Sequence, residues 1–193
     1  MSTVKSKKLQ VGTDATSSNN FTIYQPATPD GTLRIGVGNA DNPTEVGRFN
    51  SNGYIATNAP AFRAYNAGTQ SITASTNTKC IFNSEDFDTA NCFDSTTNYR
   101  FTPNVAGYYQ FNCGVYYQAS NNSFIYLVKN NSLITSRFGG IQSGYGMFVG
   151  SDIIYANGTT DYFEVYAHNG SNVTIGAGDD SLMYFSGFLA MAV

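Results

Sequence analysis

The sequence predicts an all-β protein, and three observations lead to this prediction. Charged residues make up 12% of the chain and aromatic residues 15%, whereas an ordinary soluble domain is about 25% charged. Asn, Ser, Thr, Gly, Tyr and Phe, which favour strands and turns, take the place of the Lys and Glu that favour helices. Long segments alternate between apolar and polar residues, with turn signals between them. We therefore expect nearly pure β structure.

The first 58 residues form a zone with few large apolar side chains. Short alternating segments at residues 21–24, 33–37 and 45–49 are expected to be strands, and residues 13–20 are polar. A segment this small and this poor in apolar groups cannot bury enough surface to fold alone. The sequence therefore predicts that residues 1–58 are an attachment or oligomerisation segment organised by other chains, and that residues 59–193 form a separate head.

Within the head, residues 105–117 show the longest alternation. One face is apolar and includes Tyr109, Phe111 and Tyr117, while the other face mixes Tyr, Gln, Asn and Gly. A strand with one apolar and one mixed face is expected to lie half in the core. Further strands are expected at residues 123–129, 133–138, 145–155 and 160–167. Their regular spacing and Asn-rich turns are typical of a sandwich or jelly roll.

The last segment, residues 182–193, is apolar on both faces. One side holds Met183, Phe185, Leu189, Met191 and Val193, and the other holds Tyr184, Phe188, Ala190 and Ala192. A strand in a single sandwich usually covers only its inner face, so the second apolar face indicates a neighbouring subunit. We expect most of the tyrosines to lie in such an interface, because a tyrosine suits a site with one dry and one wet end.

Charge and composition exclude several functions. Ten Lys plus Arg against thirteen Asp plus Glu give a net charge of −3, which disfavours nucleic-acid binding. The single histidine, His168, leaves no His-rich metal cage. Neither an apolar run long enough to span a membrane nor a signal peptide is found, so assembly in the cytoplasm is expected. The sequence predicts no enzyme, no catalytic residue, no cofactor and no metal.

Several residues still have a functional alternative. Asp179 and Asp180 could bind calcium through oxygen ligands, although a solvated loop is the favoured interpretation. The acidic residues Asp86, Asp88 and Asp94 could act as paired carboxylates in glycoside hydrolysis, which we disfavour. His168 is interpreted as an exposed loop residue at the end of a strand. The cysteines match no zinc spacing and are interpreted as buried free thiols, with one disulfide as the alternative; they are Cys80, Cys92 and Cys113.

Five segments of the head together resemble the C1q-like globular domain of the C1q and tumour-necrosis-factor superfamily. They are residues 60–65 (PAFRAY), 78–83 (TKCIFN), 85–88 (EDFD), 101–111 (FTPNVAGYYQF) and 185–189 (FSGFL). This resemblance covers about two thirds of the chain. It implies a ten-stranded jelly roll that assembles as a homotrimer with aromatic residues along the three-fold axis. Because the family's Leu-x-x-Gly-Asp-x-Val pattern is loosened at residues 153–165, no calcium or ligand site is carried over.

The first zone has a different resemblance. Residues 19–26 (NNFTIYQP) and 29–39 (PDGTLRIGVGN) are similar to the amino-terminal module of virion structural and fibre-like proteins of marine tailed phages, especially those that infect cyanobacteria. In such proteins a shared attachment module precedes variable heads. The resemblance implies that residues 1–58 bind other virion proteins and that the protein is located in the virion.

Three functional hypotheses follow. The first is a non-enzymatic phage structural protein, a short trimeric tail fibre or spike whose head binds a host surface glycan or protein. The second is a capsid or neck decoration protein, and the third is a soluble C1q-type binding module. The expected trimer interface comprises Tyr109, Phe111, Tyr117, Tyr184, Phe185 and Phe188. The expected ligand loops include Asn121, Asn122, Tyr145, Asp179 and Asp180.

Overall fold

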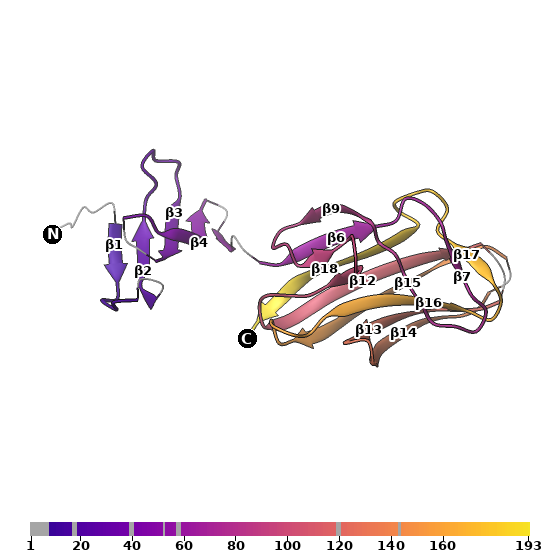
Figure 1. Ribbon diagram of the computed structural model, residues 1–193. Helices are drawn as coiled ribbons and strands as arrows, with labels where there is room; N and C mark the ends of the chain where they lie inside the picture. Colours follow the sequence, from indigo (N-terminus) through magenta and orange to yellow (C-terminus); the bar gives the residue numbers. More distant parts are fainter. Residues whose placement is uncertain are drawn as a thin grey trace. The chain divides into compact units, whose positions relative to one another are not determined.

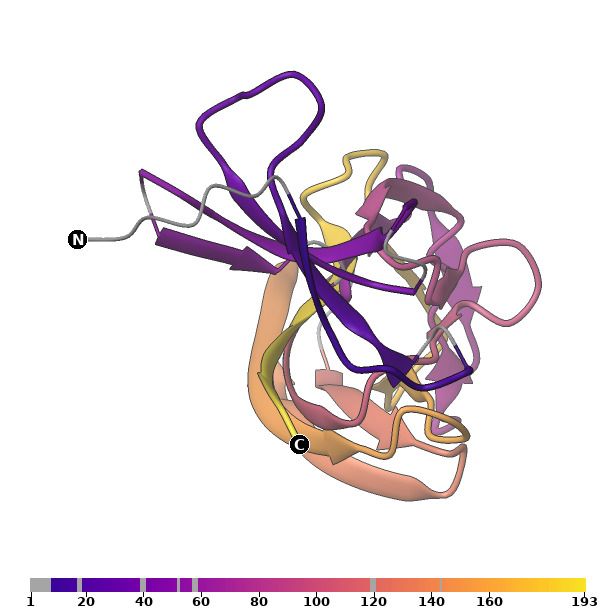
Figure 2. The ribbon, with the colours of Figure 1, turned by 90° about the vertical axis from the view of Figure 1, so that its left-hand side faces the viewer.

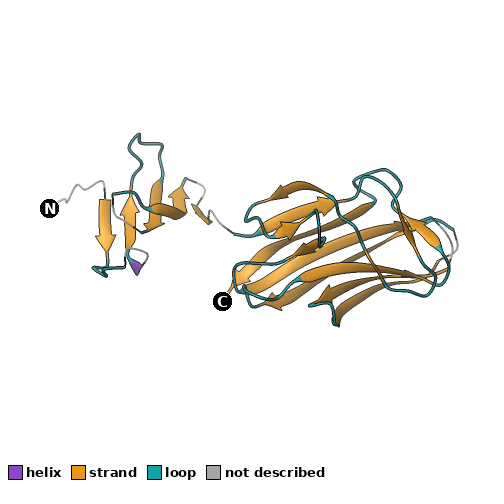
Figure 3. Ribbon diagram, viewed as in Figure 1, coloured by secondary structure: helices purple, strands orange, loops and turns teal. Residues whose placement is uncertain are grey.

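The chain consists of strands and loops, with one short helical turn at Asn19 (Figures 1 and 3). The computed structural model describes residues 8–16, 19–38, 41–51, 53–56, 59–118, 121–142 and 144–193. It divides into two compact units, Met1–Asn58 and Ala59–Val193. Each unit is described by itself.

The N-terminal unit is a single antiparallel sheet in which each strand pairs with the next along the chain. Its strands are β1 (Lys8–Val11), β2 (Phe21–Tyr24), β3 (Leu33–Val37), β4 (Thr44–Asn50) and β5 (Gly53–Ala56). Between Ile35 and Gly36 the β3–β4 register shifts, so Val46 has no partner opposite it. We call these strands the N-terminal sheet.

The head contains two antiparallel sheets. In the first, the β12 sheet, β15, β12, β18, β6 and β9 lie side by side, and β17 and β7 extend it beside the end of β12. Its strands are β6 (Ala61–Tyr65), β7 (Gln70–Ile72), β9 (Ser84–Asp88), β12 (Gly107–Tyr117), β15 (Gly146–Ala156), β17 (Val173–Ile175) and β18 (Met183–Ala192).

The second sheet, the β13 sheet, has the order β14, β13, β16, β11, β10, and β8 also pairs with β16. Its strands are β8 (Thr78–Lys79), β10 (Phe93–Asp94), β11 (Arg100–Phe101), β13 (Asn121–Lys129), β14 (Leu133–Gln142) and β16 (Phe163–Asn169). Viewed end-on, the strands of the head wrap around a common interior (Figure 2). The head is thus a jelly-roll sandwich, and the predicted all-β fold class is confirmed.

Phenylalanine rings fill the space between the two sheets. Phe62 of β6 stacks on Phe101 of β11 with ring centroids 4.3 Å apart, and Phe111 of β12 lies 4.5 Å from Phe163 of β16. Phe185 of β18 contacts both Phe62 and Phe111. Each of these rings is at most 1% exposed. Because the contacts cross from one sheet to the other, this aromatic cluster joins the two layers.

The first and last strands of the head are neighbours. β6 pairs with β18, and the Leu189 backbone N–H donates to the Pro60 carbonyl at 2.9 Å. The Val193 N–H donates to the carbonyl of Ala106, directly before β12, at 3.1 Å. The chain therefore enters the head and ends at the same end of the sandwich. The loops after β6 and β17 lie at the other end (Figure 1).

Candidate functional site

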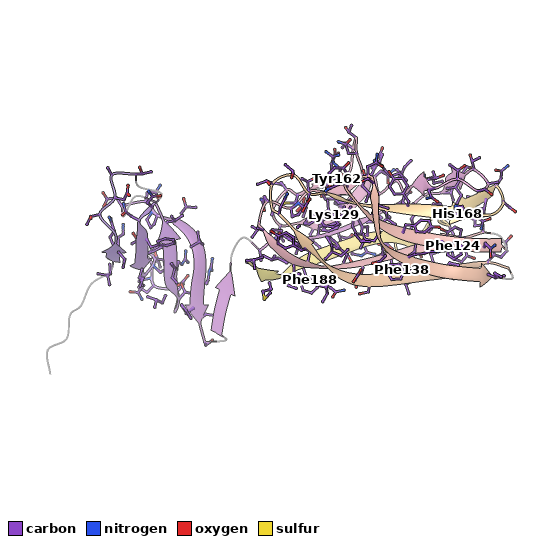
Figure 4. The ribbon with its side chains drawn as sticks, turned by 90° about the horizontal axis from the view of Figure 1, so that it is seen from below. Phe124, Lys129, Phe138, Tyr162, His168 and Phe188 are labelled. Carbon is purple, nitrogen blue, oxygen red and sulfur yellow. The ribbon has the colours of Figure 1, made fainter. Side chains whose placement is uncertain are left out.

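The outward side of the β12 sheet carries a group of exposed apolar residues. Alternation along β12 directs odd-numbered residues inward and even-numbered residues outward, as its burial pattern shows. Outward residues on three neighbouring strands are large and apolar yet 40–59% exposed; they are Tyr108, Val149, Ile153, Tyr155, Phe188 and Met191. We call this set the aromatic face. Figure 4 shows Phe188 at this outer surface.

Cross-strand pairing brings these side chains together. Tyr108 lies opposite both Tyr155 and Met191, and its ring meets the Tyr155 ring edge-on at 5.6 Å between centroids. Gln110 lies between Ile153 and Phe188. Side chains from three adjacent strands therefore contribute to one exposed surface, and exposed apolar surfaces of this kind mark interfaces.

Charges lie at the borders of the aromatic face. Lys129 forms an ion pair with Asp161 at 2.7 Å and its ammonium lies 5.7 Å from the Tyr155 ring centroid. On the opposite border Arg63 forms an ion pair with Asp86, and its guanidinium approaches the Tyr184 ring. An apolar centre with a polar border is the usual composition of a protein–protein interface.

Four residues expected in the interface lie in the core instead. Tyr109, Phe111, Tyr117 and Phe185 are at most 1% exposed, so that part of the prediction is wrong. The two tyrosines keep their hydroxyls paired inside the head: Tyr109 donates to the Val105 carbonyl at 2.8 Å and Tyr117 to the Phe124 carbonyl at 2.6 Å. Burial raises the pKa of Tyr109 to about 12 and raises that of Tyr117 further.

The other two expected interface residues lie on the outer side. Phe188 is half-exposed, while Tyr184 is partly buried, and burial raises its pKa. For Tyr109, Phe111 and Tyr117, the alternation of β12 already indicates burial, because the apolar face of this strand points into the core and its mixed face points outward.

A bulge near the end of β18 changes which residues point outward. The register moves from Tyr109 opposite Leu189 to Tyr108 opposite Met191, which leaves Ala190 unpaired. One extra residue reverses the direction of every side chain after it. Met191 is therefore exposed beside Tyr108, although strict alternation would place it on the core side with Phe185.

The N-terminal sheet has a second exposed apolar surface. One side of this sheet carries apolar residues from four adjacent strands, paired across the sheet as Val11 with Phe21 and Leu33 with Phe49, among others. Those with the largest exposure, 45–59%, are Leu9, Val11, Phe21, Leu33 and Phe49. Ile23, Ile35 and Val37 lie in register with them. We call this set the apolar face of the N-terminal sheet.

The chain covers the other side of that sheet with its own loops. Gly36 is buried there, and a Cβ at this position would lie 2.7 Å from Pro43 and 3.1 Å from Tyr24. An ion-pair group borders the same side: Arg34 contacts Asp30 at 2.5 Å and Glu45 at 3.0 Å. Hydrogen bonds from Thr32 and Arg34 lower the pKa of Asp30 to about 2. Among its described residues, the unit therefore has one covered side and one exposed apolar side.

The expected ligand loops gather at the end of the head away from its termini. Tyr145 is 71% exposed and stacks on Tyr116 at 6.4 Å. Asn121 and Asn122 begin β13, and the Asn122 carbonyl accepts from the Gly170 N–H. A polar groove of about 590 Å³ lies at this end, lined by residues that include Ser71, Gln118 and Asn172.

The acidic residues act within turns and ion pairs. Asp179 accepts hydrogen bonds from Ser181, which lower its pKa, and the Asp180 carbonyl accepts from Arg63. Asp88 accepts from the Phe93 N–H, and Asp94 accepts from the N–H groups of Thr96 and Thr97. Among the described residues, no group of three or more His, Cys, Asp or Glu is placed to hold a metal ion.

The three cysteines are buried and free, as the favoured interpretation expects. Burial raises the pKa of all three thiols, that of Cys113 to about 12. His168 differs from the expectation of an exposed loop residue: it lies within β16, partly buried, and its Nδ1 is 3.0 Å from Asn77 Oδ1. In the described part of the chain, no helix is long and apolar enough to cross a membrane.

Comparison with known proteins identifies the fold of the head. No protein-family model matches the sequence, and no curated protein is similar to it in sequence. Among solved structures, the globular domain of a zebrafish complement 1qA protein matches with a TM-score of 0.55 at 17% identity, over 70% of this chain and 99% of that one. Eiger TNF from S. frugiperda matches with a TM-score of 0.52 at 10% identity, over 70% and 93%. Murine APRIL matches with a TM-score of 0.54 at 9% identity, over 68% and 98%.

Proposed function

We propose that the chain is a non-enzymatic structural protein of a phage particle. Its head has the C1q/TNF-like jelly-roll fold, which is a fold of binding modules. Three copies would form a short fibre or spike, with the N-terminal unit bound to the particle and the head directed at the host cell surface. The observation that carries this proposal is the bare apolar face of the N-terminal sheet. The phage assignment itself rests on the resemblance of residues 19–39 to phage attachment modules.

The apolar face of the N-terminal sheet requires a partner. A domain normally buries the apolar side of a sheet against a second layer, and here the side with Leu9, Phe21 and Leu33 has no second layer within the described residues. Other chains of the particle, including further copies of this one, would provide that layer. A segment that is completed only by assembly suits an attachment role.

The aromatic face of the head supports self-association. Its apolar centre and charged border have the composition of a subunit interface, and the C1q-like resemblance implies a homotrimer. Tyr108, Tyr155 and Phe188 would then lie between subunits, in place of the buried residues Tyr109 and Phe111. Three heads held together would also bind a repetitive surface by avidity, since each further contact becomes intramolecular.

Two measurements test the proposal. Light scattering on the purified chain should give a species of three times 20.8 kDa, and a monomer at micromolar concentration would contradict the trimer. Immunogold labelling of intact particles should place the protein at the tail or the neck fibres. Labelling of the capsid faces would instead favour the second candidate, a decoration protein, which the same apolar face could equally anchor.

A further inference from the structure

A pocket on the outer side of the β13 sheet belongs to neither of the surfaces described above. It has a volume of about 230 Å³ and is lined by Asn77, Tyr126, Val128, Asn131, Ser132 and Tyr166. Tyr126 of β13 and Tyr166 of β16 lie directly opposite each other in register. Because the aromatic face belongs to the other sheet, this side would stay accessible in the proposed trimer.

Aromatic rings form the base of the pocket and its surroundings. Tyr126 and Val128 are 7–8% exposed and lie at its bottom, whereas Tyr166 is partly exposed. Next to them, Phe124 lies opposite His168, with ring centroids 6.2 Å apart, and the two lie side by side in Figure 4. The sheet thus offers an apolar ring surface of limited area at the bottom of an open hollow.

Hydrogen-bonding groups without a protein partner surround these rings. Asn131 uses its Oδ1 to accept from the Tyr166 hydroxyl at 2.7 Å, and Asn77 uses its Oδ1 with His168. In the described part of the structure, the amide nitrogens of both asparagines and the hydroxyls of Tyr126 and Ser132 have no hydrogen-bond partner. Each of them is free to bond to a ligand.

The lining carries no net charge. The buried carboxylate of Glu164 accepts from the Tyr166 hydroxyl at 3.3 Å and is paired with Lys79 at 2.6 Å. The Arg137 guanidinium lies outside the lining and stacks on Phe124, with its Cζ 3.6 Å from that ring centroid and 6.0 Å from the Tyr126 centroid. The free-energy cost of removing water from a charged ligand would therefore not be offset by a side chain of opposite charge in the pocket lining.

We propose that this pocket binds one neutral sugar residue of a glycan. A pyranose ring has an apolar face of C–H groups, which would rest on the tyrosine rings, and a rim of hydroxyls, which would bond to the free amides and hydroxyls. The volume is below the range of about 300–1,000 Å³ that encloses a drug-sized ligand, so it suits a single ring with the rest of the glycan outside. The inference deepens the proposed function, because it names the ligand class on the host surface.

Binding of free monosaccharides to the purified full-length chain tests the inference. Saturation-transfer NMR with the methyl glycosides of glucose, galactose, mannose and N-acetylglucosamine should show contact with at least one of them. The expected affinity is in the millimolar range for a ligand of about a dozen heavy atoms. No transfer from the protein to any of the four sugars would overturn the inference, while the trimer and its place on the particle would stand.

Matched variants assign the binding to this pocket. Tyr126→Phe and Ser132→Ala each remove one hydroxyl and should weaken binding about 3- to 10-fold, with unchanged thermal unfolding. The controls are Tyr145→Phe and Ser71→Ala, in the loops at the end of the head, which should leave the affinity unchanged. The reverse pattern would place the sugar at those loops and overturn the inference. Preference for a uronic acid, abolished by Arg137→Gln, would also overturn it.

Discussion

The two units of this chain bury their apolar residues in different ways. In the head, two sheets face each other and enclose rings such as Phe62, Phe111 and Phe185, each at most 1% exposed. In the N-terminal unit, a single sheet covers one side with its own loops and leaves Phe21 and Phe49 about half exposed. The head therefore completes its own core, whereas the N-terminal sheet leaves apolar side chains exposed on one side. The two units therefore differ in how much of their apolar surface they bury within themselves.

Separating the units should produce the largest effect. Residues 59–193 alone should unfold cooperatively, because their core is complete. Residues 1–58 alone should lack stable β structure at low concentration, since a single sheet with one bare side is marginal in water. Circular dichroism and thermal unfolding of the two fragments measure this difference. A monomeric N-terminal fragment with a cooperative transition would show that the unit needs no partner.

Phe111→Ala should destabilise the head by about 3–5 kcal/mol, because it removes a ring from a packed core and leaves a cavity. Urea unfolding of the full chain measures the loss. The matched variant Phe49→Ala, on the bare side of the N-terminal sheet, should leave the unfolding midpoint of the head unchanged. If the two variants shifted that midpoint equally, the units would not be independent.

Phe188→Glu should act on assembly more than on folding. Large aromatic residues in an apolar interface often contribute at least about 2 kcal/mol to the binding free energy, and a buried charge would remove this contribution. The protein concentration at which half of the trimer dissociates should therefore rise about 30-fold. Sedimentation over a dilution series measures this, with Thr73→Glu at an exposed loop position as the control. Unchanged association in Phe188→Glu would remove the aromatic face from the interface.

The smallest effect concerns pH. Hydrogen bonds from Thr32 and Arg34 lower the pKa of Asp30 from 3.8 to about 2. The folded state therefore favours the ionised carboxylate, and its contribution to stability is complete above pH 3.8 and is lost as the pH falls towards 2. NMR titration of Asp30 in the assembled protein should give the low pKa, and Asp30→Asn should remove this part of the acid sensitivity. A pKa near 3.8 would contradict the Arg34 contact.

The fold class and most strands could be predicted from the sequence. Residues 21–24 and 33–37 coincide with β2 and β3, and the alternation of residues 105–117 correctly separates the buried side of β12 from its outward side. Local periodicity is sufficient for these features, because each depends on neighbours along the chain.

The candidate sites were harder to predict, because they depend on partners across a sheet. Periodicity places Tyr109 and Tyr117 on the apolar, inward side of β12, but the family resemblance implies aromatic residues along a three-fold axis, and this led to their prediction in the interface. The bulge at Ala190 depends on the pairing of β18 with β12. The sugar pocket joins Tyr126 to Tyr166 only through the pairing of β13 with β16. No spacing along the chain indicates that these two residues meet.

The adjacent ends of the head have a practical consequence for engineering. The chain enters beside β18 and leaves beside β12, so a reporter or affinity tag fused after Val193 would emerge at the same end as the linker. An insertion in the loop after β17, at the opposite end, would not interrupt β6 or β18. The head can therefore be exchanged as a unit, joined to a different N-terminal segment through a single junction near Ala59.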